Sequence, residues 1–399
     1  MASEKCALMT QYYGKNYGSV LTAFALQKLL DNLGYYSELI KIHKPLGFAY
    51  DFSKKYLRET SQCLNNDDFQ KLNERFDTFI LGSDNQLDFM VQKQSVYRYL
   101  FNYADKSKKK IIISGSCGKP ELDKSKFDFD RIKTLLETMD YISFREYAGQ
   151  KMCQQFFNLD SDWILDPVFL IDKSAFFNLA KDSKYLCDNK KSMMAYILYD
   201  NEDKIKIVDE ISRNRNLKIN RFQGNENASH VAHKDKVSVE NWLHSVLSSD
   251  LVITDSFHCV CFCLIFNKPF VCLKNPKGYS RFESLFKKFN ISYPQIDSYS
   301  DFKNNIDNAI FTDFEKYENI VEEQKIHDIS IIKNVLVQDK VTSPLQASAY
   351  EILKEYNKTD LTLNDKFYKN NRFLYLNFIE PFVEPIVRTY RMKKEAKSD

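Results

Sequence analysis

The chain has 399 residues, with 57 Lys and Arg against 54 Asp and Glu, which gives a net charge of +3 at pH 7. This balance excludes the strong positive field of a nucleic-acid-binding protein, and no apolar run reaches the roughly 18 residues that a spanning helix needs. An apolar fraction of 44% indicates a folded protein, and the length favours about two domains.

The first elements form a strand–helix–strand unit. Residues 5–10 are a short apolar strand, and apolar residues then recur at helical spacing over residues 20–33. Ser19 is expected to cap this helix and Gly34 to end it, before residues 37–42 return to extended structure. Such a unit predicts a parallel sheet with helices on both faces.

The same alternation of strands and helices continues along the chain. Further extended segments are predicted at residues 75–82, 109–115, 141–143, 163–171, 192–199, 217–222, 251–254 and 269–273. Helices are predicted within residues 130–156, 203–215, 238–250 and 260–266. The pattern therefore predicts an α/β fold.

The alternation divides into two consecutive α/β domains, residues 1–175 and 185–335. We expect a hinge near residues 172–190 and a separate C-terminal helical tail over residues 340–399. Ligands of such folds bind beyond the carboxyl ends of the strands. The site is therefore expected in the cleft between the two domains.

Cysteine usage indicates a reducing compartment. The nine cysteines are an odd number and form no CxxC pair, which supports neither a disulfide framework nor a zinc site. They are Cys6, Cys63, Cys117, Cys153, Cys187, Cys259, Cys261, Cys263 and Cys272. With an N-terminus that lacks a signal-peptide pattern, they predict buried thiols in a cytoplasmic protein.

The segment DLVITDSFHCVCFCLIF, residues 250–266, interrupts an apolar run with Asp255, Ser256 and His258. Burying such groups without partners is costly, so we place them in the turn between a strand and the next helix. Asp255 and Ser256 are candidate helix caps. His258 is either a satisfied, partly buried histidine or a group that binds an anion or moves a proton.

Six stretches of the chain carry more specific information. They read NYGSVLTAFALQKLLDNLGY (16–35), FDTFILGSDNQL (76–87), IIISGSCGK (111–119), ISFREYAGQKMCQQF (142–156), WILDPVFLID (163–172) and VITDSFHCVCFCLIFNKPF (252–270). In this order they resemble the polysaccharide pyruvyl transferase family. The resemblance covers most of residues 5–285.

This resemblance implies two Rossmann-like domains in a GT-B-like arrangement. It also implies transfer of the enolpyruvyl-derived group of phosphoenolpyruvate onto two sugar hydroxyls, giving a pyruvate ketal and phosphate in cell-surface polysaccharide biosynthesis. No cofactor is implied besides this donor substrate. The chain departs from the family pattern at Cys259, where many members have Gly, at residues 85–87, where Gln-Val-Trp is usual, and at Ser256, where some branches have a basic residue.

Phosphoenolpyruvate carries a phosphate and a carboxylate, so its site needs fixed cations and hydrogen-bond donors. Arg145 and Arg281 offer planar, bidentate recognition. The loop from Asn16 to Ser19 opens a helix whose free amide groups and dipole suit an anion, and Gly18 allows close backbone approach. The expected donor-binding set is completed by Tyr17, Ser83 and Ser256.

Ketal formation needs protonation of the methylene carbon and removal of hydroxyl protons from the sugar. His258 is predicted as the acid or the phosphate partner, and either Asp84 or Asp255 as the base. The chain offers no acidic cluster typical of a divalent-ion site, so we expect a metal-independent reaction.

Each of these residues also has a purely structural interpretation. Arg145 could pair with Glu146 or Asp140 on the surface, an arrangement worth little. Asp84 could cap a helix, and Asn16 and Tyr17 could be ordinary turn residues. The cysteines at 259, 261 and 263 are more typical of core packing than of catalysis.

Residues 366–394 mix aromatic with basic residues and contain Pro381 and Pro385, which exclude one straight helix. One interpretation is that this tail docks on the first domain. The other is an interfacial anchor that brings the protein to the inner face of the cytoplasmic membrane, where the acceptor glycan would be carried on polyprenyl diphosphate.

Two other classes of function remain open. A GT-B-like glycosyltransferase would use a nucleotide sugar, for which Glu283 is a candidate contact. A non-catalytic member of a polysaccharide-assembly complex would use no donor.

Overall fold

The computed structural model of the protein describes residues 4–13, 16–84, 86–88, 95–118, 122–183, 191–223, 237–276, 278–293, 295–306 and 308–356. The chain divides into two compact units, Met1–Thr342 and Ser343–Asp399, and both sheets belong to the first unit. The basic and aromatic tail at 366–394 lies outside the described residues.

Among the described residues, the first sheet has seven strands in the order β3-β2-β1-β4-β5-β6-β7. All neighbouring strands run parallel. The strands are β1 (Lys5–Met9), β2 (Tyr36–Lys41), β3 (Glu59–Gln62), β4 (Thr78–Leu81), β5 (Lys109–Gly115), β6 (Tyr141–Phe144) and β7 (Asp162–Trp163). The strand order reverses direction between β1 and β4, which is where ligands of such sheets bind.

The helices of this half connect and cover the strands. They are α1 (Tyr17–Asn32), α2 (Phe48–Tyr56), α3 (Asn66–Gln70), α4 (Leu72–Arg75), α6 (Ser95–Tyr99), α7 (Phe129–Glu137), α8 (Tyr147–Met152) and α9 (Ser174–Lys181), with 3-10 turns η1 (Lys124–Lys126) and η3 (Pro167–Phe169) and a π turn η2 (Cys153–Phe157). Helix α9 lies within the segment expected as a hinge.

The second sheet has the strand order β11-β10-β8-β9 in the described part of the chain, again with parallel neighbours. Its strands are β8 (Ser192–Ile197), β9 (Lys218–Gln223), β10 (Leu251–Thr254) and β11 (Phe270–Cys272). The helices that follow are α10 (Glu202–Arg215), α11 (Val239–Ser248), α12 (Phe257–Ile265), α13 (Tyr279–Lys288), α14 (Tyr299–Asn304) and α15 (Glu315–Val337).

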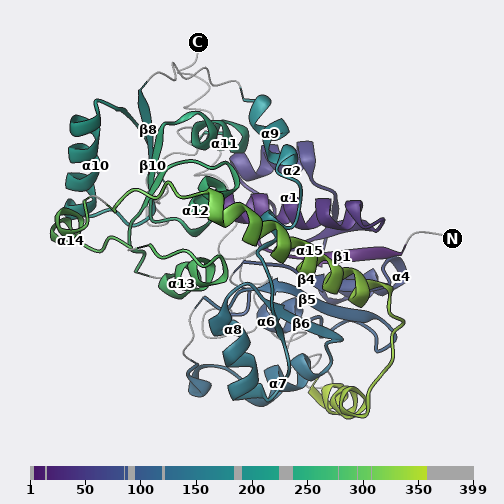
Figure 1. Ribbon diagram of the computed structural model, residues 1–399. Helices are drawn as coiled ribbons and strands as arrows, with labels where there is room; N and C mark the ends of the chain where they lie inside the picture. The colour runs from purple at the N-terminus through teal and green to yellow at the C-terminus, as the bar shows by residue number, and fades with distance from the viewer. Residues whose placement is uncertain are drawn as a thin grey trace, which may run out of the picture. The chain divides into compact units, whose positions relative to one another are not determined.

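Both faces of the second sheet are buried, as its continuous apolar strands predict. In β8, Met193 and Ala195 pack with the apolar side chains of α10 and α14, whereas Met194 and Tyr196 pack with those of α11 and α12. Figure 1 shows α10 on one side of β8 and β10, with α11 and α12 on the other. Because α12 packs on this face of the sheet, the position of its first turn is fixed.

Helix α1 begins earlier than the sequence predicts. Its cap is Asn16, whose side-chain oxygen accepts a hydrogen bond from the backbone N–H of Gly18. The expected cap, Ser19, lies inside the first turn and donates to the Asn16 carbonyl, so that prediction is wrong. The predicted end is confirmed, because Gly34 follows the C-cap with a φ of 88°.

Helix α15 was not predicted, and it anchors the second half to the first sheet. Asp328 is fully buried, and its Oδ2 accepts a hydrogen bond of 2.7 Å from the backbone N–H of Leu165. At the other end, the ammonium group of Lys109 in β5 donates to the carbonyl of Leu336 at 2.7 Å. The Lys109 contact satisfies a carbonyl in the last turn of α15 that has no helical partner.

The cysteine prediction is confirmed for the eight cysteines that the structure describes, all of which are free and buried. Cys187 lies outside the described residues. Within the described part of the chain, none of the helices is long and apolar enough to cross a bilayer.

Candidate active site

Polar side chains gather where the strands of the first sheet end. Ser83 and Asp84 follow β4, Ser116 follows β5, and Arg145 follows β6. Because the carboxyl ends of parallel strands meet at one edge of the sheet, these residues converge although they are far apart in sequence. Asp166, three residues after β7, joins them.

Arg145 is the centre of this cluster. Its side chain has no exposed surface, and its Nη1 donates to Asp166 Oδ2 at 2.7 Å and to Ser83 Oγ at 2.8 Å. Its Nη2 donates to Ser116 Oγ at 3.2 Å. Both ends of the guanidinium are therefore held by protein groups.

Three carboxylates surround the Arg145 guanidinium. Besides Asp166, Glu146 Oε1 lies 3.5 Å from Nε, and Asp84 Oδ1 lies 3.6 Å from Nη2. Burial lowers the pKa of Arg145, but these carboxylates outweigh burial and raise it above its usual value. The pKa of Asp166 is raised by burial, but more strongly lowered by Arg145 and His258, so it lies below its usual range.

The structure does not contain the alternative arrangement, a surface ion pair of Arg145. The guanidinium is buried, and Asp140, one of the two suggested partners, instead pairs with Lys340 at 2.5 Å. Glu146 does contact Arg145, but it is itself 1% exposed. Removing one charged side chain from this buried cluster would leave the remaining charges without compensation.

His258 reaches this cluster from the second half of the molecule. It lies in the first turn of α12 and is 3% exposed. Its Nε2 lies 3.0 Å from Thr22 Oγ1 and 3.2 Å from Arg145 Nη1. Nε2 of His258 therefore lies between a hydroxyl of α1 and the central guanidinium. Asp166 Oδ2 is 3.6 Å from the same nitrogen.

Gly18 is required for this approach. A Cβ atom at position 18 would lie 2.2 Å from His258 Nδ1, closer than any non-bonded contact allows. The sequence predicts that Gly18 lets a ligand approach the backbone. In the structure the group that approaches is the imidazole of His258.

The other residues of the α1 loop have structural contacts. Asn16 and Ser19 hold the first turn of the helix, as described above. The ring of Tyr17 stacks between Phe48, with ring centres 4.3 Å apart, and Trp242, at 5.3 Å. Its hydroxyl donates to the carbonyl of Val237. These contacts join the two halves and do not bring the Tyr17 side chain to Arg145.

Arg281, in α13, is the second arginine at the site. Its guanidinium carbon lies 5.9 Å from the ring centre of Phe257, and that of Arg145 lies 5.0 Å from the same ring. Its Nε is buried and has no hydrogen-bond partner among the described residues. Burial and the charge of Arg145 lower the pKa of Arg281, yet an arginine keeps its charge in proteins.

Asp255 is not part of this cluster. Its carboxylate accepts hydrogen bonds from the backbone N–H groups of Leu198, at 2.6 Å, and Tyr199, at 3.0 Å. It also pairs with the ammonium of Lys204 at 2.7 Å. Asp255 thereby ties the end of β10 to the end of β8 and to α10.

Ser256 occupies the N-cap position of α12, but its side chain makes no capping hydrogen bond. The predicted cap is therefore absent. The free backbone N–H groups of this first turn lie next to His258, and such groups attract anions.

Sequence reasoning missed four members of the cluster, namely Thr22, Ser116, Glu146 as a buried group, and Asp166. Asp166 offered a signal, since it ends an apolar run in the same way that Asp84 does. Thr22 offered none, because a threonine inside an apolar helix resembles any buried hydroxyl. Asp84 itself has a φ of 93°, a strained conformation that is typical of functional sites.

No group of three or more His, Cys, Asp or Glu side chains in the described part of the chain is arranged to hold a metal ion. The cluster instead combines two guanidinium groups, an imidazole, hydroxyls and three carboxylates. Such a set can bind an anion and exchange protons with it.

Comparison with solved structures defines the class of this fold. The chain is similar to UDP-GlcNAc 2-epimerase from Neisseria meningitidis bound to UDP-GlcNAc, with a TM-score of 0.54 and 10% identity over 84% of this chain and 99% of that one. It is also similar to the S. aureus MnaA–UDP complex, with a TM-score of 0.51 and 12% identity over 84% of this chain and 99% of that one. The predicted GT-B-like fold with two Rossmann-like halves is confirmed.

Comparison of the sequence with models of protein families identifies the family. The family model described as polysaccharide pyruvyl transferase matches residues 16–277. The chain therefore belongs to the polysaccharide pyruvyl transferase family. No curated protein matches the chain.

Proposed function

We propose that the protein transfers the enolpyruvyl-derived group of phosphoenolpyruvate to two hydroxyls of a sugar, forming a pyruvate ketal. Family membership supports the class of reaction. The observation that carries the proposal is that His258, from the second half, lies 3.2 Å from Arg145 in the first half. Beside them is a second arginine whose Nε has no hydrogen-bond partner in the part of the chain that the structure describes.

The two arginines would have different tasks. Arg145 is already held by three carboxylates, so it organises the site and orients His258 rather than offering a free face. Nε of Arg281 has no partner within the described ranges, so we assign this arginine to the phosphate or carboxylate of the donor. The uncapped first turn of α12 would contribute backbone N–H groups to the same anion.

Charge balance favours proton uptake when the donor binds. Two arginines face three carboxylates, so the site with a neutral imidazole cannot neutralise a donor that carries both phosphate and carboxylate. Binding would therefore be accompanied by protonation of a side chain at the site. That proton is then available for the methylene carbon of the donor.

The reaction would proceed in two additions. Protonation of the methylene carbon makes it a methyl group and leaves positive charge on C2, which the first sugar hydroxyl attacks while losing its proton. The C2–O bond to phosphate then breaks, phosphate leaves with the bonding electrons, and the second hydroxyl adds to C2 with loss of its own proton. The products are the cyclic ketal and inorganic phosphate.

We assign His258 to proton donation or to the leaving phosphate, and Asp84 to removal of a hydroxyl proton. Asp84 borders the cluster at 3.6 Å from Arg145 Nη2 and has the strained backbone described above. Of the two predicted bases it is the better supported, because Asp255 already accepts two backbone hydrogen bonds and an ion pair.

The acceptor is proposed to be a glycan carried on polyprenyl diphosphate at the inner face of the cytoplasmic membrane. Purified protein should release phosphate from phosphoenolpyruvate only when such a glycan is present, and the glycan should gain an acid-labile pyruvate. A parallel reaction with UDP-sugars is the control. Turnover of a nucleotide sugar without turnover of phosphoenolpyruvate would replace the proposal with the glycosyltransferase alternative.

A further inference from the structure

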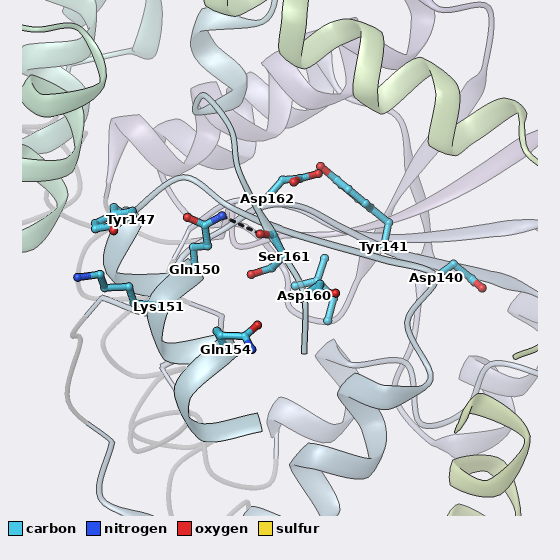
Figure 2. Close-up of a pocket in the computed structure, with 10 residues that line it drawn as sticks. Asp140, Tyr141, Tyr147, Gln150, Lys151, Gln154, Asp160, Ser161 and Asp162 are labelled. Atoms are coloured by element: carbon cyan, nitrogen blue, oxygen red, sulfur yellow. Dashed lines mark hydrogen bonds between the residues drawn. The ribbon is translucent and has the colours of Figure 1, made fainter. Parts of the chain in front are cut away.

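A second candidate site lies outside the buried cluster. A pocket of about 540 Å³ opens over α8, η2 and the strands β6 and β7. Figure 2 shows Tyr147 and Lys151 at one end and Tyr141 and Asp140 at the other, with Gln150, Ser161 and Asp160 between them. This volume falls in the range of small-molecule sites, roughly 300–1,000 Å³.

The walls of the pocket are rich in hydrogen-bonding groups. Gln150 Nε2 donates to the carbonyl of Ser161 at 2.8 Å, which fixes the amide and the loop that carries Ser161. The Oγ of Ser161 is buried without a hydrogen-bond partner among the described residues. The hydroxyl of Tyr141 is directed toward the carboxylate of Asp162 (Figure 2). Amide, carboxylate and phenol groups such as those of Gln150, Asp162 and Tyr141 match the hydroxyls of a sugar.

The charges at the pocket do not favour an anion. Asp140 is already paired with Lys340 at 2.5 Å. Of the remaining charged lining residues, Asp160 and Asp162 outnumber Lys151, whose ammonium lies 4.8 Å from the ring centre of Tyr147. The ammonium of Lys287 lies 4.2 Å from the same ring, so the charges of the two signs balance and phosphoenolpyruvate gains no net attraction here. Hydroxyl groups, in contrast, both donate to carboxylates and accept from amides and lysine.

The pocket is also tied to the active site. Tyr147, at one end of it, directly follows Arg145 and Glu146 in the chain. Trp163, next to Asp162, donates from Nε1 to the carbonyl of Arg145 at 3.1 Å. A ligand seated along α8 would therefore contact the segments that carry the central guanidinium.

We propose that this pocket binds an uncharged sugar unit of the acceptor glycan, with the planar side chains of Gln150, Asp160 and Asp162 holding its hydroxyls. The inference rests on the proposed function for the identity of the glycan as acceptor. It adds that the acceptor has a second, neutral unit held on the first half of the molecule, away from the arginines.

The test is direct binding of the full-length protein, without donor, to an array of neutral and anionic oligosaccharides. We expect neutral glycans to bind and uronic-acid glycans not to bind. Asp162→Asn, which keeps its shape, and Gln150→Ala should each weaken binding about tenfold through the loss of one or two hydrogen bonds. Asp130→Asn, at an exposed carboxylate of α7 outside the pocket, is the matched control and should bind normally.

The outcomes separate this inference from the proposed function. If neutral glycans bind and the two pocket variants lose binding, the inference stands even when phosphoenolpyruvate is not a substrate. If the wild-type protein binds no neutral glycan, or if both variants bind as it does, the inference fails. In that case pyruvyl transfer with an unchanged acceptor KM in both variants would leave the proposed function intact.

Discussion

At the scale of single residues, His258 links the two halves and is the group assigned to proton transfer. His258→Ala should fold normally and lose transfer by about 10²–10⁴-fold, the usual contribution of a positioned acid or base. The rate of phosphate release and the thermal unfolding curve measure the two effects. His244→Ala, on α11 of the same half, is the control. Near-normal turnover in His258→Ala would remove this residue from the mechanism.

Gly18 and His258 form a pair whose coupling can be measured. Gly18→Ala would place a Cβ 2.2 Å from His258 Nδ1, so we expect a loss of about 1–3 kcal/mol in the free energy of unfolding, together with lost activity. In the His258→Gly background the three contacting side-chain atoms, Nδ1, Cγ and Cβ, are absent, and alanine is the better helix residue by about 1 kcal/mol. There, Gly18→Ala should cost much less stability than in the wild type, or none.

Urea unfolding of the wild type, the two single variants and the double variant completes this cycle. Additive free energies would mean that the imidazole does not press against the first turn of α1 in solution, which contradicts the contact.

The two arginines should differ in what their removal affects. Arg281→Gln is expected to raise the donor KM at least tenfold with little change in thermal stability, since its Nε has no protein partner among the described residues. Arg145→Gln should instead destabilise the protein by about 3–5 kcal/mol, because three buried carboxylates lose their counter-charge. Equal stability of both variants would contradict the assignment of Arg145 as the organising group.

The sequence revealed the residues at strand ends but not their partners. Arg145, Asp84, Ser83 and His258 could be predicted because each follows an apolar run. That each of the three guanidinium nitrogens of Arg145 contacts a protein group could not be predicted, because it depends on which strands are neighbours. Asp255 shows the same limit, since its position after β10 resembles that of Asp84 after β4, yet its partners are structural.

At the scale of the elements, the titration of Lys110 in β5 tests whether its ammonium is buried against the end of helix α7. Its ammonium donates to Thr138, the C-cap of α7, at 2.6 Å. Burial lowers its pKa from 10.5 to about 7. The unfolded chain therefore binds more protons than the folded one between those values, and the free energy of unfolding should rise as pH increases from about 7 to 10.5.

Lys110→Met should remove this dependence. At pH 6 the variant is expected to be more stable than the wild type by a few kcal/mol, because no charge is buried, and the difference should shrink as the pH approaches 10. Urea unfolding of both proteins at about pH 6, 8 and 10 measures this difference in the free energy of unfolding. A constant difference across this range would show that Lys110 does not titrate in the folded state.

Most strands and the helices between them could be predicted from hydrophobic periodicity. Helix α1 was misplaced by about one turn because Asn16, not Ser19, has the extended backbone of a cap. Helix α15 was not predicted because its apolar residues form a sparse stripe, with Ile332 and Leu336 buried but Ile326 exposed. Its position depends on Asp328, a contact with no local signal.

At the scale of the whole molecule, one site forms only because α12 of the second half meets α1 and the ends of the first sheet. The alternating pattern predicts two sheets, and likeness to solved structures confirms their class. How closely the halves meet could not be predicted, because it depends on a glycine and an imidazole 240 residues apart.

We expect one site, between the arginines and His258, to receive a small donor with two anionic groups. A crystal structure of the protein with phosphoenolpyruvate tests this expectation. Donor density should contact Arg281 and the first turn of α12, with His258 within hydrogen-bonding distance of it. Density for phosphoenolpyruvate elsewhere on the protein, with the Arg145–His258 contact undisturbed and Arg281 unengaged, would rule out the proposed site.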